Sequence, residues 1–104
     1  MNKKNLFISN LGWKHSDFEK IIKIIKKNNI NGIDVAPIQI NNNWKNIEKK
    51  LQKFQKKLKS FNIKVNAVQG IFYKKNFNIF NSNKVQKEKI YKHIKKILKI
   101  SKIF

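Results

Sequence analysis

Side chains that could do acid–base or metal chemistry are scarce in this sequence. It contains five acidic residues, two histidines and no cysteine, which excludes disulfides and cysteine-based zinc sites. It has no glycine-rich phosphate loop and no serine nucleophile motif. His15 stands at a predicted helix start and His93 lies among the lysines of a predicted helix, so both are predicted to be solvated. Neither histidine is assigned as a metal ligand or as a base.

The net charge of +20 comes from lysine alone. Arginine, the residue that pairs bidentately with guanine and with phosphate, is absent. More than half of the 104 residues belong to four types whose codons are rich in A and T: 25 Lys, 18 Ile, 16 Asn and 8 Phe. We therefore attribute the charge to an AT-rich genome rather than to a selected polyanion site, and expect nucleic acid to bind only through non-specific charge.

Lysines interrupt every cluster of isoleucines, so no apolar run reaches the length of a membrane span. The basic N-terminus precedes an apolar stretch that is too short for a signal peptide. These features predict a cytoplasmic protein without a membrane partner.

Three short apolar segments, each followed by an amphipathic segment, predict an α/β protein with a parallel sheet. The predicted strands are residues 6–10, 33–36 and 63–69. The helices that follow have apolar residues at helical spacing, which in the first of them is i, i+3, i+4 and i+7, and this predicts one buried face on each. These faces are Phe18, Ile21, Ile22 and Ile25; Ile47, Leu51, Phe54 and Leu58; and Ile90, Ile94, Ile97 and Leu98.

Right-handed crossovers place all three helices on the same face of such a sheet. The other face then needs a cover, because parallel sheets are normally buried on both sides. No segment of residues 1–104 is predicted to supply that cover. We expect residues 1–104 to be one domain of three βα units that stops before a fourth strand.

Segments at the ends of the three predicted strands carry a family resemblance. They are Ile8-Ser9-Asn10-Leu11-Gly12-Trp13, Gly32-Ile33-Asp34-Val35-Ala36-Pro37, and Val68-Gln69-Gly70-Ile71-Phe72 with Asn78-Ile79-Phe80. In these motifs, and in their order and spacing over nearly the whole chain, the sequence resembles the xylose-isomerase-like barrel superfamily. Within that superfamily it resembles the bacterial sugar-phosphate isomerases and epimerases.

The resemblance implies a (β/α)₈ barrel of about 250 residues, of which this chain would supply the first three units. It also implies a sugar or sugar-phosphate substrate and a divalent metal whose Glu, Asp and His ligands lie on later strands, outside this chain. The metal would stabilise the enediolate that forms when a base removes a proton beside the sugar carbonyl. The expected function is a truncated sugar isomerase or epimerase that is inactive by itself.

Substrate-binding groups of such a barrel come from the carboxyl ends of its strands and the loops after them. This implies five candidates: Asn10, Trp13, His15, Asp34 and Gln69.

Each candidate also has a structural interpretation. Asp34 would point into the barrel, because Ile33 and Val35 share the opposite face of the strand. It would contact a sugar hydroxyl or a catalytic group, or form a structural hydrogen bond to the turn after the first strand. The structural alternatives for the others are a turn residue (Asn10), an aromatic seal (Trp13), a solvated loop histidine (His15) and a strand cap (Gln69).

Residues 72–77 interleave aromatic and basic side chains. Proteins that bind single-stranded nucleic acid use this combination, because bases stack on the rings while lysines follow the phosphates. A small lysine-rich nucleic-acid-binding protein is therefore the alternative function. The family resemblance instead implies an active-face loop in which Phe77 and Phe80 pack as local core.

Overall fold

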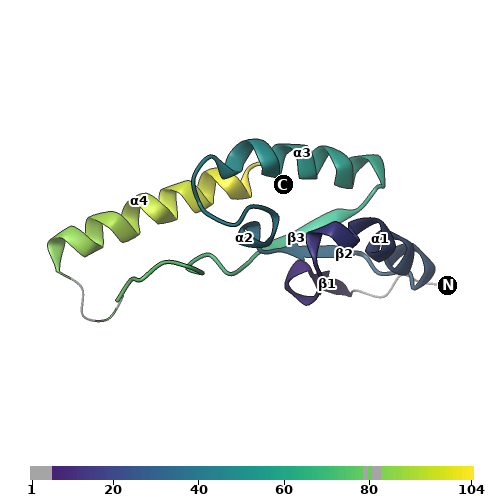
Figure 1. The fold of residues 1–104 in the computed structure, drawn as a ribbon, viewed down its shortest axis with the longest axis horizontal. Helices are drawn as coiled ribbons and strands as arrows, with labels where there is room; N and C mark the ends of the chain where they lie inside the picture. The colour runs from purple at the N-terminus through teal and green to yellow at the C-terminus, as the bar shows by residue number, and fades with distance from the viewer. Residues whose placement is uncertain (1–5, 79, 81–82) are drawn as a thin grey trace.

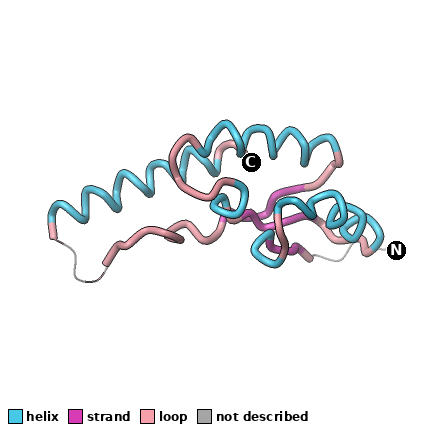
Figure 2. The backbone as a smooth tube through the Cα atoms, in the orientation of Figure 1, coloured by secondary structure: helices cyan, strands magenta, loops and turns pink. Residues whose placement is uncertain are grey.

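The computed structural model describes residues 6–78, 80 and 83–104. The strands lie side by side with helices next to them, and the last helix extends away from the strands (Figures 1 and 2). In chain order the elements are β1 (Phe7–Ser9), the 3₁₀ turns η1 (Asn10–Gly12) and η2 (His15–Asp17), α1 (Phe18–Lys27), β2 (Gly32–Val35), α2 (Pro37–Ile40), α3 (Ile47–Ser60), β3 (Lys64–Val68) and α4 (Lys84–Ser101).

The sheet has three parallel strands in the order β1-β2-β3, as the sequence predicts. Ile8 pairs with Ile33, and Ile33 pairs with Val65. The register between β2 and β3 shifts after Ile33, so that Asp34 pairs with Ala67. The fold class is therefore mixed α/β with consecutive βα units.

The buried faces predicted for the first two helices are largely confirmed. Phe18, Ile22 and Ile25 of α1 are buried, and Ile21 packs at the edge of the same cluster. All four predicted residues of α3 are buried. One core cluster joins α1 and α3 to Ile33 and Val35 of β2, which places both helices on one face of the sheet.

The predicted inner face of the last helix is partly wrong. Asn83 caps α4 as its side chain accepts a hydrogen bond from the Gln86 N–H at 2.9 Å. However, Leu98 is 59% exposed and Ile94 is 39% exposed. The buried residues of α4 are His93, Ile97 and Ile100.

The reason is that, among the described residues, α4 packs mainly through its C-terminal half. Ile97 and Ile100 contact a second core cluster that includes Trp44 and Leu51, whereas the N-terminal half extends beyond α3 (Figure 1). That extension gives the molecule its length, with principal extents of 52, 25 and 22 Å.

The sheet face opposite the helices carries polar residues. Ile33 and Val35 are fully buried under the helices, and Asp34 alternates with them onto the other face. On the neighbouring strand Asn66 and Ala67 are exposed, so this face is open at β3. Within the described residues no helix is long and apolar enough to cross a bilayer.

Candidate ligand-binding site at the strand ends

Two pairs of polar side chains meet near the carboxyl ends of the parallel strands. The Gln69 side-chain amide donates to Ser9 Oγ at 2.6 Å, although 60 residues separate them. The Asn66 amide donates to Asp34 Oδ1 at 3.0 Å. Because carboxyl ends of parallel strands lie at the same edge of a sheet, residues from all three strands converge here. We call Ser9, Asp34, Asn66 and Gln69 the strand-end row.

Asp34 is half-buried on the face away from the helices, the face predicted from its alternation with Ile33 and Val35. Its structural hydrogen bond goes to Asn66 on β3 rather than to the turn after β1. The other carboxylate oxygen has no protein hydrogen bond within the described part of the chain. Asp34 can therefore accept a hydrogen bond from a ligand without losing its own support.

Asn10 is not accessible to a ligand in the way that Asp34 is, because it is buried. Its side chain is 1% exposed and is held by the backbone of Ala36 on both sides. Asn10 Nδ2 donates to the Ala36 carbonyl at 3.1 Å, and Asn10 Oδ1 accepts from the Ala36 N–H at 2.6 Å. This geometry favours the structural interpretation, in which Asn10 ties the end of β1 to the end of β2.

Trp13 and His15 lie with the helices and not with the strand-end row. The Trp13 ring stacks on Phe18 with ring centroids 6.0 Å apart, and its carbonyl accepts a hydrogen bond from Gln39. The His15 ring lies 5.3 Å from the ring of Phe54. Of the five predicted residues, the fold brings only Asp34 and Gln69 into one site.

Sequence reasoning missed Ser9 and Asn66. Both are polar residues beside apolar neighbours in short strands, and the two-residue period of a strand could have identified them. Their partners could not be identified in this way, because the pairing depends on the register between strands.

His93 is buried and not solvated as predicted; its residue is 5% exposed. Its ring packs edge-on against Trp44, with centroids 4.7 Å apart, and also contacts Phe72 and Phe77. His93 Nε2 carries the proton, because it is hydrogen-bonded to the Ile71 carbonyl, which can only accept. The lysines around it in the sequence obscure this burial, which arises because α4 folds back over the loop after β3.

The ring contacts and the exposure of the aromatic residues test the prediction that Phe77 and Phe80 pack as local core. Phe77 is half-buried and its ring lies 5.9 Å from that of Phe72, so Phe77 packs as predicted. Phe80 is 100% exposed, which contradicts the prediction that it packs as local core.

Stability is expected to fall as the pH drops through about 6.5, the ordinary pKa of histidine. Burial lowers the pKa of His93, with the Ile71 carbonyl opposing this and Lys75 and Lys96 adding to it. The unfolded chain therefore binds the proton more readily, so protonation favours unfolding. Urea unfolding at a series of pH values measures the effect.

His15 contributes with the same sign, because partial burial and then Lys57 and Lys50 lower its pKa. We expect a shallower pH dependence in His93→Gln, which keeps a neutral donor for Ile71, and the shallowest in the double variant with His15→Gln. An unchanged slope in His93→Gln would contradict the assignment.

Residues 6–78, 80 and 83–104 contain no group of three His, Asp or Glu side chains that could hold a metal ion. These residues do not form the metal site that the family resemblance implies, and no chemical step is assigned to a metal here.

A scan of protein-family models and searches of curated proteins and solved structures found no match. Function is therefore inferred from the fold and the strand-end row.

Proposed function

We propose that this chain provides the first three βα units of a sugar isomerase or epimerase of the (β/α)₈ type. Its part in that function is to bind the sugar. The observation that carries the proposal is the strand-end row, two hydrogen-bonded polar pairs on the sheet face opposite the helices. In a (β/α)₈ barrel the corresponding face points inward, and ligands bind where its strands end.

The chemistry of the row suits a ligand with several hydroxyl groups. A sugar hydroxyl both donates and accepts, so it needs partners of both kinds. Asp34 offers an acceptor through its second carboxylate oxygen, whereas the amides of Asn66 and Gln69 each have a carbonyl and an NH₂ group. The cross-strand hydrogen bonds hold these groups in place before the ligand arrives, which reduces the entropy lost on binding.

The parent reaction in this proposal is metal-assisted proton transfer beside a sugar carbonyl. We assign none of its chemical steps to the described residues, because they bring no three metal-ligating side chains together. Residues 1–104 are accordingly expected to bind a sugar weakly and not to convert it.

Nuclear magnetic resonance of the ¹⁵N-labelled chain, titrated with a neutral aldopentose, tests this function. The side-chain amides of Asn66 and Gln69 and the backbone amides of Ser9 and Asp34 are expected to shift together. A neutral sugar is the right probe, because the lysines would attract any anion regardless of the site.

Gln69→Ala is expected to weaken the affinity for the sugar, measured from these shifts, by about fivefold, because one hydrogen bond is lost. Gln52→Ala, at an exposed position of α3, is the matched control and should leave them unchanged. Shifts that are absent from the strand-end row up to the solubility limit of the sugar would refute the proposal.

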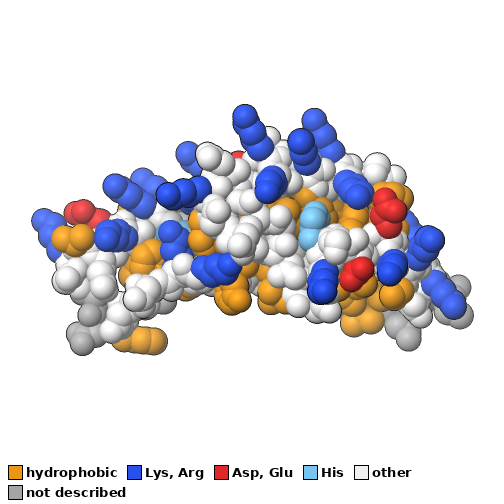
Figure 3. All heavy atoms as spheres, viewed as in Figure 1, with side chains coloured by type: hydrophobic (Ala, Val, Ile, Leu, Met, Phe, Trp, Pro, Cys, Tyr) orange, Lys and Arg blue, Asp and Glu red, His pale blue; other side chains and the backbone are white. Residues whose placement is uncertain are grey.

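The lysine-rich surface supports only non-specific attraction of nucleic acid in this proposal (Figure 3). Specific single-strand binding needs free ring faces. Phe72 and Phe77 instead pack against each other and against His93. Within residues 72–77 Tyr73 is the one mostly exposed ring, and the exposed rings of Phe80 and Tyr91 lie outside that segment.

A further inference from the structure

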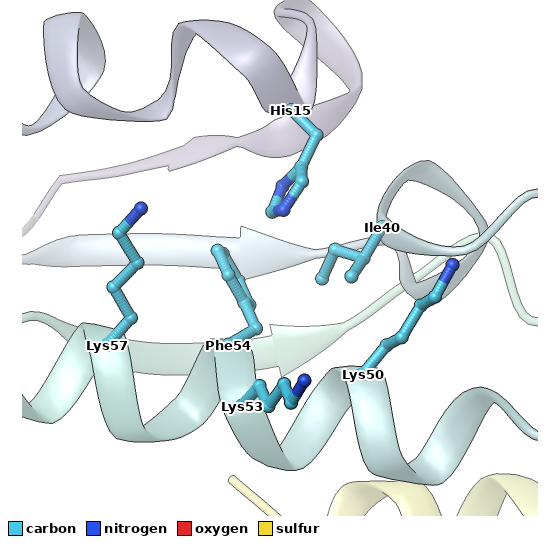
Figure 4. A pocket seen from close by; sticks show the side chains of 6 residues that line it. All are labelled: His15, Ile40, Lys50, Lys53, Phe54 and Lys57. Atoms are coloured by element: carbon cyan, nitrogen blue, oxygen red, sulfur yellow. The ribbon is translucent and has the colours of Figure 1, made fainter.

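A pocket of about 350 Å³ lies in the helix layer, between η2 and α3 (Figure 4). Its lining residues are His15, Ile40, Lys50, Lys53, Phe54 and Lys57. Phe54 and Ile40 form an apolar floor. His15 points toward Phe54 from the opposite wall, and Lys50 and Lys57 rise on either side of that ring (Figure 4).

The pocket is positively charged, with no acidic residue in its lining. Lys50, Lys53 and Lys57 follow one another at three- and four-residue intervals, which places them on one side of α3, where like charges repel. Lys57 Nζ lies 4.9 Å from the ring centroid of Phe18. Within the described part of the chain, none of the three lysines forms an ion pair.

The lowered pKa of His15 is consistent with the same positive potential. Its pKa is lowered by partial burial, and then by the charges of Lys57 and Lys50. A bound anion would offset that repulsion and would also be attracted by all three lysines.

Two features of this site matter for ligand binding. The lysines surround a hollow, and its floor consists of apolar and aromatic side chains. A free inorganic anion would use only the lysines, whereas an organic phosphate would also cover Phe54 and Ile40 with its carbon skeleton. The volume is at the lower end of the range for small-molecule sites, which fits a compact ligand.

We propose that this pocket binds a small organic phosphate monoester. Lys50, Lys53 and Lys57 surround the phosphate, and the ester group lies against Phe54 and Ile40. This site is separate from the strand-end row, because Phe54 belongs to the core cluster on the helix side of the sheet. The two proposals can therefore fail independently.

Phenyl phosphate is the probe, with inorganic phosphate and sodium chloride of equal ionic strength as comparisons. Binding is followed through the His15 ring proton and through backbone amides of α3. Phenyl phosphate is expected to bind more tightly than inorganic phosphate and to raise the pKa of His15. Sodium chloride should leave the pKa nearly unchanged.

The double variant Lys50→Gln with Lys53→Gln should weaken phenyl phosphate binding about tenfold, because each charge pair at a partly exposed site contributes severalfold. Lys59→Gln removes a charge from the same helix outside the pocket and should change binding less than about twofold. Circular dichroism checks that the variants keep their helices.

The proposal would be overturned if Lys59→Gln weakened phenyl phosphate binding as much as the double variant does. It would also be overturned if phenyl phosphate left the His15 resonance unchanged. Titration with a single-stranded oligonucleotide tests the alternative that the lysines form a non-specific polyanion surface. If the oligonucleotide binds while phenyl phosphate does not, the lysines act as a non-specific polyanion surface and not as a small-molecule site.

Discussion

Replacement of Gly32 by alanine is expected to destabilise the protein by about 3 kcal/mol or more. A Cβ atom at this position would lie 2.0 Å from the Lys64 carbonyl oxygen and 2.8 Å from the Lys64 carbonyl carbon. Both are backbone atoms of the neighbouring strand, so no side-chain rotation can relieve the overlap. The strands would have to separate at the point where Gly32 pairs with Lys64.

Separation at Gly32 would also disturb the core, because the next residue, Ile33, is fully buried beneath the helices. Urea unfolding followed by circular dichroism measures the loss. The control is Gly12→Ala, since a Cβ added there would lie within 4 Å of no described atom beyond its chain neighbours. We expect Gly12→Ala to change the free energy of unfolding by less than about 0.5 kcal/mol. Similar midpoints for the two variants would contradict the close approach of β2 and β3.

Asn10→Ala is expected to cost about 2–4 kcal/mol, because it removes both hydrogen-bond partners of a buried backbone unit. Asn10 Nδ2 and Oδ1 satisfy the carbonyl and the N–H of Ala36, which is itself fully buried. Alanine would leave these two groups unpaired and a cavity where the amide was. The ends of β1 and β2, where the strand-end row begins, would lose their direct link.

The free energy of unfolding again measures this effect, and hydrogen exchange of the Ala36 amide locates it. Asn28→Ala is the matched control, because the Asn28 amide donates to the Ile24 carbonyl at an exposed position. There water can replace the lost bond, so we expect a change of about 0.5 kcal/mol or less. If Asn10→Ala costs no more than Asn28→Ala, the buried link is not formed as described.

Comparison of α3 with α4 shows how far periodicity predicts burial. Each turn of α3 packs on a core cluster, so its apolar stripe and its buried face coincide. The apolar residues of α4 are similarly spaced, but the N-terminal half of that helix has little to pack against. Periodicity identifies the face that a helix would bury, whereas its neighbours decide how much of that face is buried.

The sequence by itself determined the order of the strands and of the helices other than the short α2, the parallel pairing of the strands, and the side of β2 that faces the helices. These features follow from local periodicity and from the geometry of short crossovers, which depend on nearby residues. The candidate site was predicted only in part, since Asp34 and Gln69 were identified without Ser9 and Asn66.

The tertiary structure decided which polar side chains meet. Ser9 and Gln69 lie 60 residues apart in the chain, and the pairing of Asp34 with Asn66 depends on a register shift between β2 and β3. His93 is buried only because Trp44 and the loop after β3 close around it. Such contacts join residues far apart in the chain, so no local pattern encodes them, and they form only when the strands and helices pack together.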